Sequence, residues 1–213
     1  MARGQLILIE GLDRSGKSTQ AELIAKHLQP SKLIKFPNRS TPIGKVINEY
    51  LENKEFELTD ESAHLLFSAN RWEIAHEIEE LLNNGNFVIL DRYIYSGIAY
   101  TLSKETGPNS VLSSVDWLIG PDKGLPKPDL TIFLSLDIDE ISSRKGWGNE
   151  RYEMKQFQIK VKESFMKILN QDDSSIKIVE VDKSSIEQVN EKLMNVINSE
   201  MKDILIDSPI NKI

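Results

Sequence analysis

Residues 11–19 constrain this chain more than any other stretch. They read Gly-Leu-Asp-Arg-Ser-Gly-Lys-Ser-Thr and follow directly on the apolar run of residues 6–9. The stretch therefore fits the phosphate-binding pattern GxxxxGK followed by Ser or Thr, in the strand, loop and helix context that gives the pattern its meaning. Its glycines let backbone N–H groups point into an anion-sized hollow, and the new helix presents its positive end there. We expect a nucleotide-phosphate site formed by Arg14, Ser15, Gly16, Lys17, Ser18 and Thr19, and not a chance glycine-rich turn.

Composition limits the class of protein. The chain has 213 residues, 39% of them hydrophobic, so we expect residues 1–213 to form a single domain with a sizeable core. The formal net charge is −7, whereas a nucleic-acid-binding protein needs a basic face. We therefore expect no nucleic-acid partner, and any anion should be bound by a local cluster of cations. The lack of cysteine excludes disulfides and cysteine-based zinc sites.

The sequence contains no targeting or membrane signal that stands out. The first ten residues carry a buried-strand pattern without a cleavage site, and no apolar run approaches the length needed to span a bilayer. We expect no membrane partner and a location in the cytoplasm. Whether the protein also works in the nucleus is left open.

Strands and helices are predicted to alternate along the chain. Five apolar runs rich in β-branched residues read as strands covered on both faces: residues 6–9, 32–36, 87–90, 130–136 and 176–181. Helical spacing of apolar residues follows the phosphate loop and recurs over residues 186–204. This order predicts an α/β fold with three layers, in which a five-stranded parallel sheet has helices on both faces.

Local signals place several boundaries. Thr41-Pro42 reads as an N-cap followed by proline at the first helical position, and residues 59–84 read as one long helix with acids in its first turn. Residues 106–128 are poor in periodicity and read as an ordered excursion with a short helix around 111–118. We expect the tail after about residue 207 to fray.

The third predicted strand ends in Asp91-Arg92-Tyr93. An acid at the carboxyl end of a parallel strand beside the phosphate loop is where Mg²⁺ coordination of the Walker B type is placed. The alternative is that Asp91 only caps the next turn. We expect Asp91 and Ser18 to hold Mg²⁺, and Arg92 to lie near the same site.

The long helix carries an arginine on its apolar face. Phe67, Arg71, Ile74 and Ile78 fall on one stripe. An arginine there is costly to desolvate, so Arg71 either extends to the rim or holds a buried anion or carbonyl. Phe67 alone reads as a core residue, but beside Arg71 it forms an apolar surface next to a planar donor, which suits a heterocyclic base.

Two further segments of the chain are cationic. Residues 144–152 place two glycines around a tryptophan among basic groups, which is typical of a flap or lid that covers a phosphate and equally of a solvated surface loop. Residues 36–40 follow the second predicted strand and place Arg39 at the edge of the sheet where the phosphate loop is expected, but that motif is weak on its own.

The expected chemistry needs no general base. His27, His64 and His76 show no metal-ligand spacing and read as structural or surface residues. A phosphate monoester acceptor is already largely ionised near neutral pH, because its second pKa is about 6. Catalysis then reduces to alignment, Mg²⁺ and cations around the transferred group.

These motifs together resemble those of the thymidylate kinase family of the eukaryotic and poxviral kind, among the P-loop nucleoside monophosphate kinases. The resemblance rests on the phosphate loop, Phe36-Pro37-Asn38-Arg39, residues 65–73 and Asp91-Arg92-Tyr93 in that order, with residues 124–129 and 150–153 in support. It extends from about Arg3 to the C-terminal helix. It implies the three-layer P-loop kinase fold, transfer of the ATP γ-phosphoryl group to dTMP to give dTDP and ADP in dTTP synthesis, and Mg²⁺ as cofactor.

The resemblance also implies roles for individual residues. Phe67 would stack on thymine and Arg71 would donate to its carbonyl edge, while Arg39 and Arg92 would hold the acceptor phosphate. Asp13 would meet the deoxyribose 3′-hydroxyl, and Tyr93 would exclude a ribose 2′-hydroxyl. The rest of the dTMP pocket would be Phe36, Ser96, Gly97, Tyr100, Tyr152 and Gln158.

For the donor, the resemblance implies that Arg14 is a catalytic arginine and that Arg144 packs on adenine. The implied catalytic set is Arg14, Lys17, Asp91, Arg92 and Arg144. The family forms homodimers through helix packing, and the long helix of residues 59–84 could serve in this way.

Other functions are alternatives to this one. A deoxynucleoside kinase would need a carboxylate base near a neutral hydroxyl acceptor, and a broader pyrimidine deoxynucleoside monophosphate kinase is a second alternative within enzymes. A GTPase switch needs a guanine-reading Asn-Lys-x-Asp element, which does not occur, since Asn53-Lys54 is followed by Glu55-Phe56. Residues 103–115 match no pattern of the family, and Lys145 is an additional cation in the flap.

Overall fold

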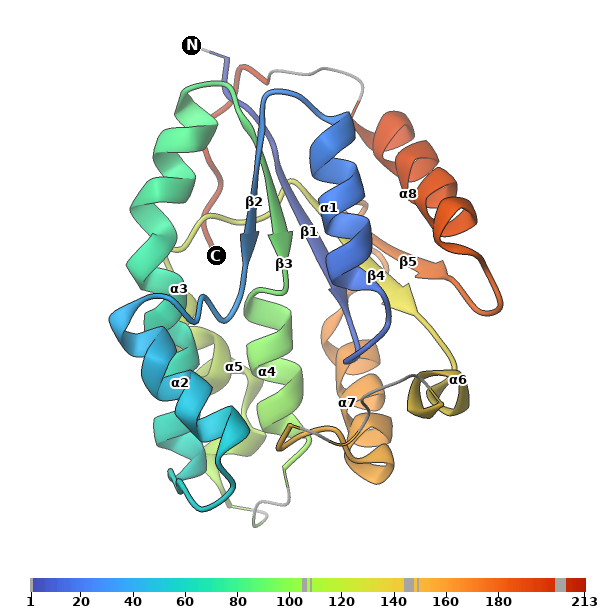
Figure 1. The fold of residues 1–213 in the computed structure, drawn as a ribbon. Coiled ribbons are helices and arrows are strands. Elements are labelled where there is room, and N and C mark those ends of the chain that lie inside the picture. Colours follow the sequence, from blue (N-terminus) through green and yellow to red (C-terminus); the bar gives the residue numbers. More distant parts are fainter. Residues whose placement is uncertain (1, 105–106, 108, 144–147, 149, 202–205) are drawn as a thin grey trace.

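A five-stranded parallel sheet forms the centre of the chain (Figure 1). The computed structural model describes residues 2–104, 107, 109–143, 148, 150–201 and 206–213. The elements follow in the order β1 (Leu6–Gly11), α1 (Lys17–His27), β2 (Ser31–Lys35), α2 (Pro42–Glu52), α3 (Asp60–Asn83), β3 (Phe87–Asp91), α4 (Ile94–Leu102), η1 (Val111–Ser113), α5 (Val115–Ile119), η2 (Gly120–Asp122), β4 (Leu130–Ser135), α6 (Ile138–Ser142), α7 (Lys155–Ile168), β5 (Ile176–Glu180) and α8 (Ile186–Glu200).

The sheet order is β2-β3-β1-β4-β5, and each neighbouring pair is parallel. Every predicted apolar run is a strand whose observed ends lie within two residues of the predicted ones. The parallel sheet of the sequence prediction is therefore confirmed, and β1, which leads into the phosphate loop, lies at its centre beside β3.

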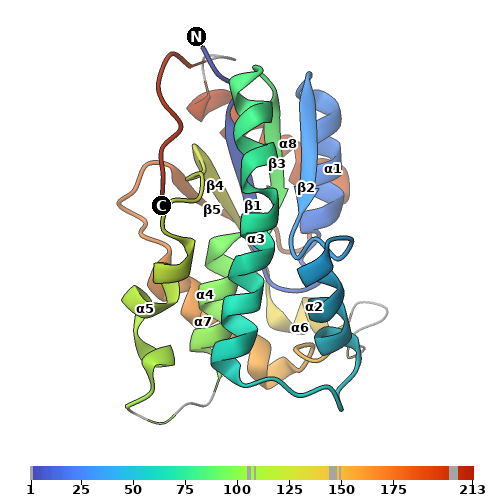
Figure 2. The same cartoon turned by 90° about the vertical axis from the view of Figure 1, so that its left-hand side faces the viewer.

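Helices cover both faces of the sheet. Leu6 and Leu8 belong to a buried cluster with Ile78 of α3, whereas Ile7 and Ile9 belong to a larger one that includes α1 and α8 and also residues of α4 and α7. Helices α1 and α8 lie together on one face, and α3, α4 and α7 lie on the other (Figures 1 and 2). Successive residues of a strand point to opposite faces, so a strand that is apolar throughout requires both layers.

The predicted helix starts are confirmed. The Thr41 hydroxyl accepts the N–H of Gly44 at 3.0 Å, and the Thr59 hydroxyl accepts that of Ser62 at 3.2 Å. The apolar stripe predicted over residues 186–204 forms α8, which ends at Glu200, and residues 202–205 are outside the described part of the chain. No helix in the described residues is both long and apolar enough to cross a membrane.

The C-terminal tail is not frayed, so that expectation was wrong. The Ile213 N–H donates to the Leu125 carbonyl at 2.9 Å, and the Gly124 N–H donates to the Ile213 carbonyl at 3.2 Å. The Arg3 guanidinium donates to two further tail carbonyls, and Ile210 packs against the buried cluster of α3. The partners of the tail lie far away in sequence, and local composition carries no sign of them.

We predict that ending the chain after Asp207 lowers the free energy of unfolding by roughly 2 kcal/mol or more. The change removes backbone hydrogen bonds that each contribute about 0.5–1.5 kcal/mol net, together with apolar burial. Urea denaturation measures the difference. Ser208→Ala is the control, because that side chain is exposed and the backbone bonds remain. A truncated chain as stable as the full one would contradict the structure.

Candidate active site

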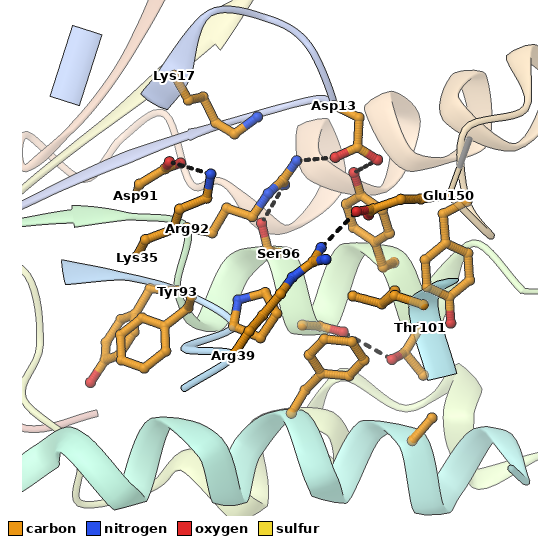
Figure 3. Close-up of a pocket in the computed structure, with 18 of the residues that line it drawn as sticks. Asp13, Lys17, Lys35, Arg39, Asp91, Arg92, Tyr93, Ser96, Thr101 and Glu150 are labelled. Atoms are coloured by element: carbon orange, nitrogen blue, oxygen red, sulfur yellow. Dashed lines mark hydrogen bonds and ion pairs between the residues drawn. The ribbon is translucent and has the colours of Figure 1, made fainter. Parts of the chain in front are cut away.

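A cavity of about 260 Å³ opens at the carboxyl ends of β1 and β3 (Figure 3). This edge is where parallel α/β sheets bind ligands. The cavity brings together most residues selected from the sequence: Asp13, Arg14, Lys17, Ser18, Phe36, Arg39, Phe67, Arg71, Asp91, Arg92, Tyr93, Ser96, Gly97, Tyr100 and Tyr152. Ser15, Gly16 and Thr19 lie in the phosphate loop and the first turn of α1 but do not line the cavity. Arg144, with much of the predicted flap, lies outside the described residues.

The phosphate loop contains residues with positive φ. Gly16, with φ of 96°, precedes α1, and Arg14 also has a positive φ, of 60°. The buried ammonium of Lys17 donates to the Leu12 carbonyl within the loop and to Ser15 Oγ at 3.4 Å. Burial, aided by Arg92, lowers the pKa of Lys17. A cation this dehydrated gains strongly from an anion placed beside it.

Ser18 and Asp91 adjoin each other as predicted. Ser18 Oγ donates to Asp91 Oδ2 at 2.5 Å, and Lys35 Nζ lies 3.1 Å from Ser18 Oγ and 3.7 Å from Asp91 Oδ2. Asp91 Oδ1 is buried and has no hydrogen-bond partner among the described residues. A buried carboxylate oxygen without a partner, next to a hydroxyl, fits Mg²⁺. Sequence reasoning missed Lys35, which it assigned only to the second strand.

Metal binding here would need ligands beyond the protein. The part of the chain that the structure describes has no group of three or more His, Cys, Asp or Glu residues that could hold an ion. Mg²⁺ commonly uses one or two carboxylates and takes its remaining ligands from water and substrate phosphates. The pair of Ser18 and Asp91 suits that arrangement.

Arg92 and Asp13 form the centre of a hydrogen-bond network. Arg92 has a φ of 69° and donates to Ser96 Oγ at 3.0 Å and to Asp13. Asp13 Oδ2 also accepts from Tyr100 Oη at 2.9 Å and from Gln158 Nε2 at 3.0 Å. Burial raises the pKa of Asp13, but Arg92 and the other partners together lower it by more, so the carboxylate stays ionised. Gln158, which does not line the cavity, thus orients a residue that does.

Glu10 supports this network through hydrogen bonds to Tyr93 and Ser96. Glu10 was not predicted as a site residue from the sequence. It is fully buried, and its carboxylate accepts the N–H groups of Tyr93 and Ser96 at 3.0 Å and the Ser96 hydroxyl at 2.6 Å. Burial raises the pKa of Glu10 against the opposing effect of Arg92. The available signal was an acid at the end of an apolar strand, immediately before the phosphate loop.

Arg71 holds a buried anion, which is one of its two expected outcomes. Its Nε and Nη2 atoms donate to Asp122 Oδ1 and Oδ2 at 2.9 and 2.7 Å, and Ser68 Oγ donates to Oδ1 at 2.7 Å. The side chains of Arg71 and Asp122 are 3% and 0% exposed. Phe67 lines the cavity one helical turn before Arg71. Asp122 was missed because residues 106–128 carry no periodicity.

Two acids, one near the end of the predicted flap and one just after it, contact Arg39 and Arg14. Arg39 Nη2 lies 2.7 Å from Glu150, and Arg14 Nε lies 2.7 Å from Glu153. Glu153 also accepts the Gly148 N–H at 3.0 Å. The sequence singled out this segment as a motif but gave these two acids no role. Figure 3 shows Arg39 and Arg92 directed into the same space, each beside its acid.

Comparison with known proteins agrees with this geometry. Residues 9–193 match the family model described as thymidylate kinase. The chain is 41% identical over 211 residues to thymidylate kinase of Dictyostelium discoideum, which covers 97% of this chain and 90% of that protein. It is 43% identical over 195 residues to that of Homo sapiens, covering 90% of this chain and 88% of the human one.

A solved structure is more similar still. Thymidylate kinase from Candida albicans superposes with a TM-score of 0.96 and 58% sequence identity, covering 100% of this chain and 99% of that one. The family model spans most of the sequence, and the relatives match over nearly their whole length. The chain belongs to the thymidylate kinase family.

Proposed function

We propose that this protein transfers the γ-phosphoryl group of ATP to dTMP, giving dTDP and ADP. The observation that carries the proposal is that one cavity is lined by two kinds of group. Arg39, Arg92 and Lys17 come from segments that follow the carboxyl ends of strands, whereas Phe67 and Arg71 come from α3. A nucleoside monophosphate likewise combines a charged phosphate with a flat base.

At the donor end, we propose that the phosphate loop and Lys17 hold the ATP phosphates and that Arg14 stabilises charge on the transferred group. Ser18 and Asp91 would hold Mg²⁺, which would supply positive charge to offset that of the ATP phosphates. Support comes from the adjacent hydroxyl and the Asp91 oxygen that has no partner within the described residues. Packing of Arg144 on adenine stays part of the proposal.

At the acceptor end, we propose that Arg39 and Arg92 bind the dTMP phosphate, with Phe67 against thymine and Arg71 at its carbonyl edge. Asp13 would bind the 3′-hydroxyl, and Tyr93 would limit space for a 2′-hydroxyl. The same pocket would be completed by Phe36, Ser96, Gly97, Tyr100 and Tyr152, and Gln158 would contribute to it by orienting Asp13. The phosphate would take the place of Glu150 on Arg39, a contact that is more than a third exposed on both sides.

The state of the carboxylates favours a phosphate acceptor over a hydroxyl acceptor. A deoxynucleoside kinase needs a carboxylate able to take a proton from the acceptor. Asp13 and Glu150 are instead engaged by Arg92 and Arg39, and Glu10 accepts three hydrogen bonds at the start of α4. Positive charge at this point suits an acceptor that is already an anion.

An ADP-release assay with dTMP, dUMP, dCMP, dGMP and thymidine tests the proposal directly. We expect turnover of dTMP to be fastest and thymidine to give none. The Candida albicans thymidylate kinase is described as having broad substrate specificity, so the assay also measures how far this chain accepts other monophosphates. Turnover of thymidine without turnover of dTMP would replace this proposal with the deoxynucleoside kinase alternative.

Arg14→Ala should lower kcat by about 10³-fold or more, with only a few-fold change in the KM values. Arginines that stabilise the transferred phosphoryl group contribute about 10³–10⁵ in related enzymes. Steady-state kinetics with both substrates measures the effect, and Lys26→Ala, an exposed cation at the end of α1, is the control. An unchanged kcat would remove Arg14 from catalysis.

We also propose that the protein is a homodimer that pairs through α3. Leu65 and Trp72 lie two turns apart on this helix and are 45% and 44% exposed, so they form an apolar face of the kind that a second copy covers. Leu65→Glu should convert the dimer to a monomer in sedimentation equilibrium at micromolar concentration. Ile186→Glu, on the opposite layer, should not. A wild-type monomer, or a Leu65→Glu dimer, would contradict this pairing.

The cytoplasmic location expected from the sequence stays a prediction, as does any share of the activity in the nucleus. Imaging of the tagged chain in cells distinguishes the two compartments.

A further inference from the structure

The pairing between Arg71 and Asp122 leaves one part of the guanidinium exposed to the cavity. Nε and Nη2 are engaged by the two oxygens of Asp122, and no described residue accepts a hydrogen bond from Nη1. The buried side-chain atoms without a partner in the described residues are Asp91 Oδ1 and Tyr93 Oη. Nη1 is not one of them, so this atom reaches the open space of the cavity that Arg71 lines.

Gly97 of α4 shapes the space around the guanidinium. A Cβ atom at position 97 would lie 3.0 Å from Nη1 and 3.1 Å from Nη2 of Arg71. Any larger residue would therefore push the guanidinium from its present plane. Asp122 holds the Nε and Nη2 edge of the guanidinium, and the backbone of Gly97 lies against its Nη1 and Nη2 atoms. Contacts with η2 and α4 together therefore set the direction in which Nη1 points.

Asp122 is a permanent partner, unlike the acid on Arg39. It is fully buried, its Oδ1 is also held by Ser68, and Trp72 Nε1 donates to the carbonyl of Pro121 at 2.7 Å, which ties the segment to α3. The pair of Arg39 and Glu150 is 37% and 38% exposed. A ligand phosphate can replace Glu150, but it has no access to replace Asp122.

The two charges offset each other for their neighbours. Burial lowers the pKa of His64, and there Arg71 and Asp122 act in opposite directions. Burial raises the pKa of Tyr93, and there too Arg71 lowers the pKa while Asp122 raises it. Arg71 therefore offers its N–H donors from an ion pair whose formal charges cancel, which suits a neutral carbonyl better than a second phosphate.

We propose that Asp122 is a positioning residue that sets base selection, because it fixes Nη1 of Arg71 toward the base and cancels the charge of that arginine. This inference rests on the proposed function. Nη1 can only donate a hydrogen bond. It therefore pairs with a keto oxygen of thymine, whereas the amino group that cytosine carries in place of that oxygen is itself a donor and cannot accept its hydrogen. A site that leaves buried donors unsatisfied rejects the wrong ligand strongly.

Asp122→Asn tests this role while conserving the shape of the side chain. Its amide NH₂ would face an N–H of Arg71, so the guanidinium has to turn, and its charge is no longer cancelled. We expect the KM for dTMP to rise at least about tenfold, and the ratio of kcat/KM for dTMP over dCMP to fall at least about tenfold. The KM for ATP should stay within about twofold, because the donor end is unchanged.

A double-mutant cycle shows whether Asp122 acts through Arg71. In an Arg71→Ala background, Asp122→Asn should leave the dTMP to dCMP ratio unchanged, and a further drop of the same size would overturn the proposal. Asp129→Asn is the matched control, since Asp129 forms a similar two-bond pair with buried Arg3 away from the cavity. An equal loss of selectivity in that variant would show a general effect of stability and would overturn the proposal.

Ser68→Ala covers the case in which Asp122→Asn does not fold. It removes one hydrogen bond to Asp122 and should shift the same ratio about threefold in the same direction, whereas an unchanged ratio would overturn the proposal. The wild-type protein is measured first. Its failure to turn over dTMP would overturn the proposed function and this inference together, whereas wild-type turnover with an unchanged ratio in Asp122→Asn overturns this inference alone.

Discussion

The pairing of guanidinium groups with carboxylates inside the cleft is the interaction on which the site depends. The chain carries a net charge of −7, yet four arginines among the described residues line one cavity. Each lies against an acid: Arg14 with Glu153, Arg39 with Glu150, Arg71 with Asp122 and Arg92 with Asp13. Removing one partner of a buried pair costs about 3–5 kcal/mol. The acids therefore keep the guanidinium groups in place and offset their positive charge inside the cleft.

The pairs differ in how easily a ligand can replace the carboxylate on the arginine. Arg39 and Glu150 meet at the rim, where water competes and the contact contributes little to stability. Arg71 and Asp122 meet where water has no access, so their contact fixes a geometry. Under the proposed function, a ligand phosphate replaces Glu150 on Arg39, whereas Arg71 stays paired with Asp122 and donates to the base. The same residue type thus serves two purposes, which depend on burial and not on sequence.

Much of this architecture follows from local sequence, because the relevant interactions are local. The phosphate loop, the five strands and the start of α3 at Thr59 depend on spacing, propensity and caps within a few residues. The site residues that could be predicted sit at strand ends or on helix stripes, as Asp91 and Arg71 do. Glu10, Asp122 and the order of the C-terminal tail could not be predicted, because their partners lie between about 50 and more than 200 residues away. Asp122 itself also lies in a segment without periodicity.

A crystal structure with dTMP and a non-hydrolysable ATP analogue tests the exchange of partners most directly. In that complex the guanidinium of Arg39 should have left Glu150, and that of Arg14 should have left Glu153, with both on phosphate oxygens. The contact between Arg71 and Asp122 should be unchanged, with Nη1 on a base carbonyl. Arg39 and Arg14 still paired with their acids while both nucleotides are bound would contradict the account.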